Sequence, residues 1–239
     1  MTAPLLSVSG LAAGYGEQQV LFGVDLDVGR GEAVSLMGRN GMGKTTTVRA
    51  VMGLLPVRAG RIDFDGRAIA GEPPFRIAQA GIGLVPEGRQ IFPTLSVEEN
   101  LIATARRSEG DTPASAWTLE RIYAFFPRLA LRRQNLGEQI SGGEQQMLAL
   151  GRALMTNPKL LILDEATEGL APLVREEIWQ RLAILRREGL AILIIDKNVD
   201  ALTRFSDRHL ILEKGRVVWQ GDSEALAADR AARDRHLSV

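Results

Sequence analysis

Runs of apolar residues that end on glycine or on charged residues recur along the chain and predict β-strands. The most compact are "AVSLMG", "GIGLVP", "KLLILDE" and "LAILIID", in which large aliphatic side chains follow one another. Strands that are apolar on both faces are typical of a parallel sheet covered on both sides. The looser runs "LLSVSGL", "HLILEKG" and "RVVWQGD" are expected to form antiparallel strands instead.

Segments with helical periodicity alternate with these strands, among them "GKTTTVRAVMGLL" and "PLVREEIWQRLAILRREG". This alternation predicts an α/β fold with a mostly parallel sheet flanked by helices and an N-terminal antiparallel β subdomain. Residues 96–156 contain no convincing strand, so we expect an inserted α-helical lobe there, within a core formed by residues 1–95 and 157–239. The polar segment 106–115 is expected to be an exposed loop, and residues 223–239 a solvated end helix.

Composition narrows the class of protein only slightly. With 29 basic and 29 acidic residues among 239, the net charge gives no indication of nucleic-acid binding. The absence of cysteine excludes disulfides and thiolate metal sites, and two histidines exclude a histidine-rich metal site. No apolar run approaches the roughly 20 residues of a membrane helix, and the first residues lack a signal-peptide pattern. We therefore expect a soluble chain that is not exported and that reaches a membrane only by docking.

The segment "GRNGMGKT" at residues 38–45 follows a predicted strand and precedes a predicted helix, which is the context of a phosphate-binding loop. Its glycines allow backbone N–H groups to point at phosphate oxygens, and the helix N-terminus adds partial positive charge. Lys44 is expected to reach the β- and γ-phosphates, and Thr45 to offer a hydroxyl to Mg²⁺. The predicted nucleotide-binding residues here are Gly38, Arg39, Asn40, Gly41, Met42, Gly43, Lys44, Thr45 and Thr46.

Two carboxylates end the apolar run "KLLILDE" at residues 159–165. Asp164 at the end of a strand suits the coordination shell of Mg²⁺, directly or through water. Glu165 is then placed to polarise or deprotonate an attacking water. A strand that simply ends in solvated charges is the alternative, but the phosphate loop in the same chain favours the catalytic interpretation.

The stretch "ISGGEQ" at residues 140–145 resembles the "LSGGQ" signature of ABC-transporter ATPases, with Ile140 for leucine and an extra Glu144. Ser-Gly-Gly at a helix start is a second anion-binding N-terminus. Because one chain has a single phosphate loop, we expect a head-to-tail dimer with itself or a sister ATPase. The γ-phosphate on one subunit would then be covered by the signature of the other, that is by Ser141, Gly142, Gly143 and Glu144.

The resemblance covers nearly the whole chain and is strongest to the F-type ATPases of branched-chain amino-acid importers. It rests on the long stretches "VPEGRQIFPTLSVEENL", "SGGEQQMLALGRALM" and "DEATEGLAPLVREEI". The family implies a single P-loop ATPase domain, ATP with Mg²⁺, and an aromatic residue stacked on adenine, for which Tyr15 has the matching position. Plain packing of a loop is the alternative for Tyr15.

Several positions depart from the wider family, among them Ala166, which stands in place of a proline and carries no functional weight. Glu87 replaces a glutamine that contacts Mg²⁺ and senses the membrane subunit, and Ala171 replaces an aspartate. Lys197 replaces a histidine that touches the γ-phosphate. A charged lysine donates hydrogen bonds but accepts none, so it would bind the γ-phosphate without relaying a proton. The alternative for Lys197 is an ion pair with Asp196 or Glu165 at a solvated strand end.

The resemblance implies an importer ATPase at the inner face of the cell membrane, coupled to permease subunits and indirectly to a substrate-binding protein. The permease would dock in a cleft of the lobe near Phe92, Pro93 and Tyr123. Branched-chain or related amino acids are the expected cargo. An importer of urea or amides, a non-transport ABC ATPase, an assembly subunit with little turnover and a small-molecule kinase remain the alternatives.

Overall fold

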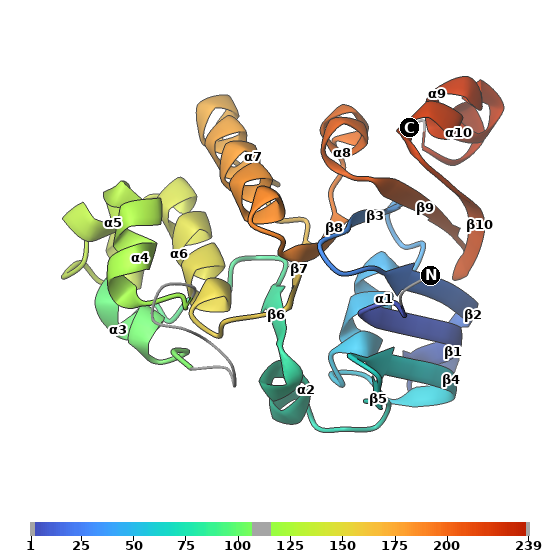
Figure 1. Cartoon of the computed structure of the whole chain (residues 1–239), viewed down its shortest axis with the longest axis horizontal. Coiled ribbons are helices and arrows are strands. Elements are labelled where there is room, and N and C mark those ends of the chain that lie inside the picture. Colours follow the sequence, from blue (N-terminus) through green and yellow to red (C-terminus); the bar gives the residue numbers. More distant parts are fainter. Residues whose placement is uncertain (1–2, 107–115, 238–239) are drawn as a thin grey trace.

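Two sheets form the framework of the computed structural model, which describes residues 3–106 and 116–237 (Figure 1). The larger sheet has the strand order β10-β9-β3-β8-β7-β6 and the smaller one β2-β1-β4-β5. The strands of the larger sheet are β3 (Ala33–Met37), β6 (Ile82–Val85), β7 (Leu160–Asp164), β8 (Ala191–Ile195), β9 (Arg208–Glu213) and β10 (Arg216–Gly221). Those of the smaller sheet are β1 (Leu6–Tyr15), β2 (Gln18–Val28), β4 (Val57–Phe64) and β5 (Arg67–Ala68).

The larger sheet is parallel from β9 to β6, and its central strands β3, β7 and β8 are fully buried. Alternate residues of β7 enter different cores, since Leu160 and Ile162 pack toward α1 whereas Leu161 and Leu163 pack toward α6 and α7. The solid apolar runs therefore predicted the parallel sheet correctly. The expectation for "HLILEKG" was half wrong, because β9 is antiparallel to β10 but parallel to β3.

The smaller sheet is antiparallel throughout, as expected for an N-terminal β subdomain. Its strand β2 was missed by the sequence analysis, although Val24, Leu26 and Val28 are buried and alternate with exposed residues. Asp25 and Asp27, which made this stretch look polar, lie on the open face. There the Asp25 carboxylate accepts a hydrogen bond from the Gly10 backbone, 2.7 Å away.

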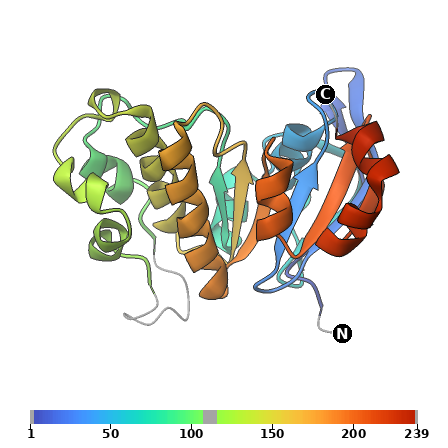
Figure 2. The same cartoon turned by 90° about the horizontal axis from the view of Figure 1, so that it is seen from above.

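Helices cover both faces of the larger sheet. Those beside the phosphate loop and the core strands are α1 (Lys44–Val51), α2 (Pro74–Ala80), α7 (Pro172–Arg187) and α8 (Val199–Phe205). The segment between β6 and β7 forms α3 (Val97–Ile102), α4 (Leu119–Phe125), α5 (Pro127–Leu131), the 3-10 turn η1 (Gly137–Gln139) and α6 (Gly142–Leu154). Figures 1 and 2 agree that α3–α6 and the antiparallel sheet lie at opposite ends of the molecule. The predicted loop at 106–115 lies outside the described residues apart from Arg106.

The C-terminal segment corrects a prediction, because it forms two short helices rather than one solvated helix. These are α9 (Ser223–Ala228) and α10 (Arg230–His236), and Leu226 of α9 is fully buried. Asp229 separates them: its carboxylate accepts from Ala232 N at 2.9 Å and from Trp219 Nε1 at 3.1 Å. No helix among the described residues is long and apolar enough to cross a membrane.

Candidate active site

The carboxyl ends of the parallel strands β3, β7 and β8 meet at one edge of the larger sheet. This edge is where ligands bind in open α/β sheets. It brings together the loop after β3, the carboxylates Asp164 and Glu165 after β7, and Lys197 after β8. Asp164, Glu165 and Lys197 each lie close enough to Lys44 for their charges to act on its pKa.

The loop before α1 is shaped by glycines in conformations that other residues rarely adopt, with φ of 140° at Gly38 and 105° at Gly43. A Cβ on Gly38 would lie 2.3 Å from the carbonyl oxygen of Leu212 in β9, so the close approach of the two backbones also requires glycine. Gly43 caps α1 without any side-chain hydrogen bond. The first N–H groups of this helix are therefore not occupied by a cap and are suited to phosphate oxygens.

Lys44 is almost fully buried, and its ammonium donates to the carbonyl oxygens of Gly38 at 2.8 Å and Arg39 at 3.0 Å. Burial lowers the pKa of Lys44, whereas the charges of Glu165 and Asp164 act to raise it. The ammonium thus folds back on the loop that is predicted to hold the phosphates. A triphosphate would offer it stronger, charge-assisted hydrogen bonds.

The hydroxyl of Thr45 donates to Asp164 Oδ1 at 3.2 Å, which places both predicted Mg²⁺ ligands side by side. Burial raises the pKa of Asp164, the Thr45 hydrogen bond lowers it, and the nearby charge of Glu87 raises it further. A buried carboxylate beside a hydroxyl and a second carboxylate is an all-oxygen set that fits a hard cation such as Mg²⁺. The residues therefore fit the predicted ion.

Glu165 takes part in a small network of charges. Its Oε2 lies 3.3 Å from the ammonium of Lys197, which also forms a shorter ion pair with Glu168. Burial raises the pKa of Glu165, and so does the Glu168 carboxyl, whereas Lys197 lowers it. A carboxylate with a raised pKa is a better proton acceptor than an ordinary one. Lys197 pairs with Glu165 as one alternative predicted, but its other partner is Glu168 rather than Asp196.

Asp196 has a structural role in place of an ion pair. It is buried, accepts from the hydroxyl of Thr167, and accepts from Asn198 N at 2.9 Å. These bonds connect the segment after β7 to the start of α8 and fix the position from which Lys197 reaches Glu165.

Two further predicted residues lie nearby. The side chain of Tyr15 is exposed at the end of β1, and its hydroxyl accepts from Arg49 of α1 at 3.4 Å. Glu87 is exposed, and one of its carboxylate oxygens lies within 4.8 Å of oxygens of Glu165 and Glu168. Tyr15 therefore lies beside the phosphate-loop helix α1, and Glu87 lies beside the carboxylates of Glu165 and Glu168.

The signature segment lies elsewhere, at the N-terminus of α6 in the helical lobe (Figure 1). Ser141 Oγ accepts from Glu144 N at 3.3 Å, and Glu144 Oε2 accepts from Ser141 N at 2.8 Å, which is a capping box. Glu144 is thus occupied by its own helix. The guanidinium of Arg89 lies against Gly142 and donates to Gln145 at 3.1 Å.

Comparison with known proteins decides the family. A family model described as ABC transporter matches residues 21–168. The chain belongs to the ABC transporter family. It is 38% identical over 233 residues to the high-affinity branched-chain amino acid transport ATP-binding protein BraG of Pseudomonas aeruginosa, covering 98% of this chain and 99% of that relative. It is also 35% identical over 235 residues to the lipopolysaccharide export ATP-binding protein LptB of Haemophilus influenzae, covering 98% and 97%.

Solved structures agree with this membership. A structure described as the ATP binding subunit of an ABC transporter superposes with a TM-score of 0.82 at 31% identity, covering 98% of this chain and 96% of that one. The expected P-loop ATPase fold is thereby confirmed. The chain is an ATP-binding, ATP-hydrolysing ABC subunit.

Sequence reasoning missed residues of this ABC ATPase that contact predicted site residues, among them Glu168 and Arg89. Glu168 holds Lys197, and Arg89 lies over the signature. Glu168 stands in the stretch "DEATEGL", three residues after Glu165, so its nearness to the strand end was the available signal. Arg89 has φ of 64° and stands in a loop whose course the sequence pattern does not predict.

Proposed function

We propose that this ABC ATPase powers the import of branched-chain or related amino acids. The observation that carries the proposal is its 38% identity to BraG along nearly the full length of both chains. The similarity to LptB is almost as high, so direction and cargo need an experiment of their own. The arrangement of charges at the sheet edge supports the hydrolytic part of the proposal.

ATP would bind with its phosphates on the loop of residues 38–46 and its adenine on Tyr15. Lys44 would leave the carbonyl oxygens of Gly38 and Arg39 for the β- and γ-phosphates, because charge-assisted hydrogen bonds are stronger than neutral ones. The free N–H groups at the start of α1 would bind phosphate oxygens as well.

Thr45 and Asp164, with Glu87 beside them, would hold Mg²⁺, which neutralises charge on the phosphates when it is bound. Glu165 would orient the attacking water and accept its proton, helped by the raised pKa of its carboxyl. Its backbone N–H donates to the Ile195 carbonyl oxygen at 2.9 Å, which ties the base to the neighbouring strand β8.

Lys197 would exchange partners during the reaction. Its ammonium now lies between Glu165 and Glu168 and is about half exposed, so it can turn toward a γ-phosphate without leaving a buried site. This movement would free the Glu165 carboxylate for water and place a cation beside the charge that develops on the transferred group. The negative charges of Glu165, Glu168 and the γ-phosphate would keep the ammonium of Lys197 charged, so it would not relay a proton.

The second half of each site would come from a partner subunit. In the proposed head-to-tail dimer, Ser141 and the glycines after it cover the γ-phosphate bound to the other chain. The proposed lobe of residues 96–156 carries this signature and, with the exposed Phe92, the docking cleft for permease subunits at the inner membrane face. Phe126 is fully buried and belongs to the packing of the lobe.

Turnover measured against protein concentration tests the dimer. Activity per chain should rise with concentration, because each site needs two chains, and Glu165→Gln should remain inactive at all concentrations. Activity per chain that stays constant over the whole range, in a sample that sedimentation shows to be monomeric, would contradict the shared site.

Transport is tested in the source cell. Deletion of the coding sequence should lower the uptake of radiolabelled leucine, and wild type but not Glu165→Gln should restore it. Affinity purification of tagged Glu165→Gln from membranes should recover permease subunits. Normal leucine uptake together with defective lipopolysaccharide export would instead support the LptB-like alternative.

A further inference from the structure

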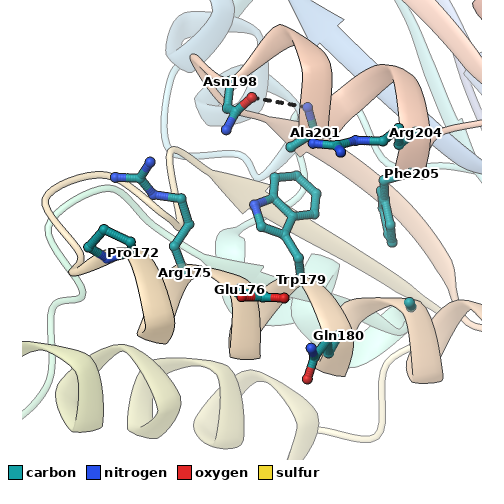
Figure 3. A pocket seen from close by; sticks show the side chains of 10 residues that line it. Pro172, Arg175, Glu176, Trp179, Gln180, Asn198, Ala201, Arg204 and Phe205 are labelled. Atoms are coloured by element: carbon teal, nitrogen blue, oxygen red, sulfur yellow. Dashed lines mark hydrogen bonds between the residues drawn. The ribbon is translucent and has the colours of Figure 1, made fainter.

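A groove between α7 and α8 lies outside the site described above (Figure 3). Its volume is about 560 Å³, which is enough for a small molecule. The apolar part of its wall is formed by the rings of Trp179 and Phe205, packed edge to face with centroids 5.4 Å apart, and by Ala201.

The indole nitrogen of Trp179 is the first sign of a ligand. Nε1 is buried and has no hydrogen-bond acceptor among the described residues. A buried donor without a partner is unfavourable, because it has given up its hydrogen bonds to water. Figure 3 shows that this nitrogen is on the side of the ring that faces Arg175 and Asn198. An acceptor placed between these three side chains would satisfy it.

Arg175 and Asn198 also present donors to this space. Among the contacts of the described residues, the Arg175 guanidinium forms one hydrogen bond, to the Leu170 carbonyl oxygen at 3.2 Å, and no ion pair. The Asn198 side-chain oxygen accepts from Ala201 N at 3.0 Å, which leaves its NH₂ group for the groove. The donors of three side chains thus converge beside an apolar wall.

The charged residues that line the groove also favour a negatively charged ligand. Arg204 is the second guanidinium, and within the described part of the chain it has no carboxylate partner either; its Nε donates to the Asp200 carbonyl oxygen. Glu176 is the one carboxylate of the lining, and Figure 3 shows it below the indole ring, on the side away from Asn198.

We propose that this groove binds a small carboxylate that carries an apolar body. The carboxylate would accept from Trp179 Nε1, Arg175 and the Asn198 amide, while the apolar body would pack on Trp179 and Phe205. Two acceptor oxygens match a fork of donors in the way that guanidinium groups recognise carboxylates. Because Nε1 is covered, the side chains around it have to shift to admit the ligand.

Arg175 and Asn198 connect the groove to the catalytic edge. Arg175 and Asn198 also line a second, smaller pocket together with Glu165, Glu168 and Lys197. A ligand that draws Arg175 away from the Leu170 carbonyl oxygen would release the segment that follows Glu168. Occupation of the groove would therefore change the rate of ATP hydrolysis. This regulatory step rests on the proposed mechanism, whereas binding itself does not.

Indole N–H signals of ¹⁵N-tryptophan-labelled protein test binding directly. The chain has three tryptophans, and single Trp→Phe variants assign their signals. Titration with 4-methylpentanoate at millimolar concentrations should shift the Trp179 signal downfield in a saturable way. The uncharged isostere 4-methylpentanamide should not do so, and Trp219, already bonded to Asp229, should stay in place.

Asn198→Asp is the matched variant, because an aspartate keeps the oxygen that caps α8 but replaces the amide donor with a negative charge. It should weaken binding of 4-methylpentanoate at least tenfold. An unmoved Trp179 signal with the carboxylate, an equal shift with the amide, or a shift with inorganic phosphate alone would each overturn the proposal. Since no ATP is needed, failure here is distinguishable from failure of the proposed ATPase mechanism.

Discussion

Two helix N-termini of this chain carry similar glycine-rich sequences but are completed in different ways. At α1 the cap is Gly43, which makes no side-chain hydrogen bond to the helix, and Lys44 and two carboxylates lie beside this helix end. At α6 the cap is Ser141, whose capping box with Glu144 satisfies part of the helix end. The first terminus lies beside the proposed catalytic groups, whereas among the described residues no group of the catalytic edge contacts the second.

The two helix ends are therefore suited to different parts of the proposed reaction. An open helix end beside a buried lysine is suited to phosphate, and the carboxylates beside it are suited to a metal ion, all within one chain. A capped end whose first residues are Gly142 and Gly143 can add backbone donors to a phosphate, but its capping box supplies neither base nor metal ligand. In the proposed head-to-tail dimer, the signature would therefore act on another chain's phosphate loop.

The largest effect is expected at the phosphate-loop terminus. Glu165→Gln should lower the turnover number by about 10²–10⁴-fold, because it removes the proton acceptor while leaving the fold and the phosphate donors. ATP binding, measured by equilibrium dialysis, should be retained. Glu188→Gln, at an exposed ion pair with Arg121, serves as the matched control and should hydrolyse ATP normally. Substantial turnover in Glu165→Gln would assign the base to another residue.

Mixing two inactive variants tests whether the two termini belong to one composite site. Lys44→Ala damages the phosphate loop, and Ser141→Arg damages the signature. In a 1:1 mixture about a quarter of wild-type turnover should return, since half of the dimers are mixed and each has one intact site. Phosphate release from the mixture and from each variant alone gives the comparison. No recovery in a mixture that forms dimers would contradict the shared site.

Replacement of Lys197 should have an effect of intermediate size on turnover. Lys197→Ala should lower turnover roughly tenfold, or ~1.4 kcal/mol of barrier, because a cation beside the γ-phosphate is lost. Lys197→Arg should keep much of the activity, since the charge remains. Equal turnover of Lys197→Ala and wild type in a steady-state assay would mean that the lysine only pairs with Glu165 and Glu168.

The smallest effect concerns the pH dependence of the stability of the larger sheet. His209 is buried in the larger sheet, and burial lowers its pKa below the ordinary 6.5. The unfolded chain then binds the proton more readily, so stability is full above about pH 6.5 and decreases as the pH falls toward the lowered pKa. Urea unfolding at several pH values should show this loss, and His209→Gln should reduce the slope.

The hydrogen bonds of His209 explain why the neutral form fits. Ser223 Oγ donates to the Thr203 carbonyl oxygen at 2.6 Å, so it accepts from His209 Nε2 at 2.8 Å. Nδ1 then accepts from Ser35 Oγ at 2.7 Å. An unchanged stability between pH 7 and pH 5 in wild type would show that the histidine titrates alike in both states.

Much of the fold could be predicted because its strands are apolar on both faces, as in "LLILD" and "AILII". The strand β2 escaped because its outward positions hold Asp25 and Asp27, and a half-buried strand with charged residues looks like a loop without its neighbour. The break between α9 and α10 at Asp229 was not predicted for a related reason. The Asp229 carboxylate accepts a hydrogen bond from Trp219 of strand β10, a contact that the local sequence does not reveal.

The phosphate loop, the strand-end carboxylates and the signature could be located from the amino-acid order, because each depends on residues that are adjacent in the chain and on local backbone geometry. Which side chains these residues contact is set by the packed fold. The contact of Lys197 with Glu168 joins the segments after β8 and β7, and the donors around Trp179 come from α7 and the start of α8, so these long-range contacts depend on how the elements pack.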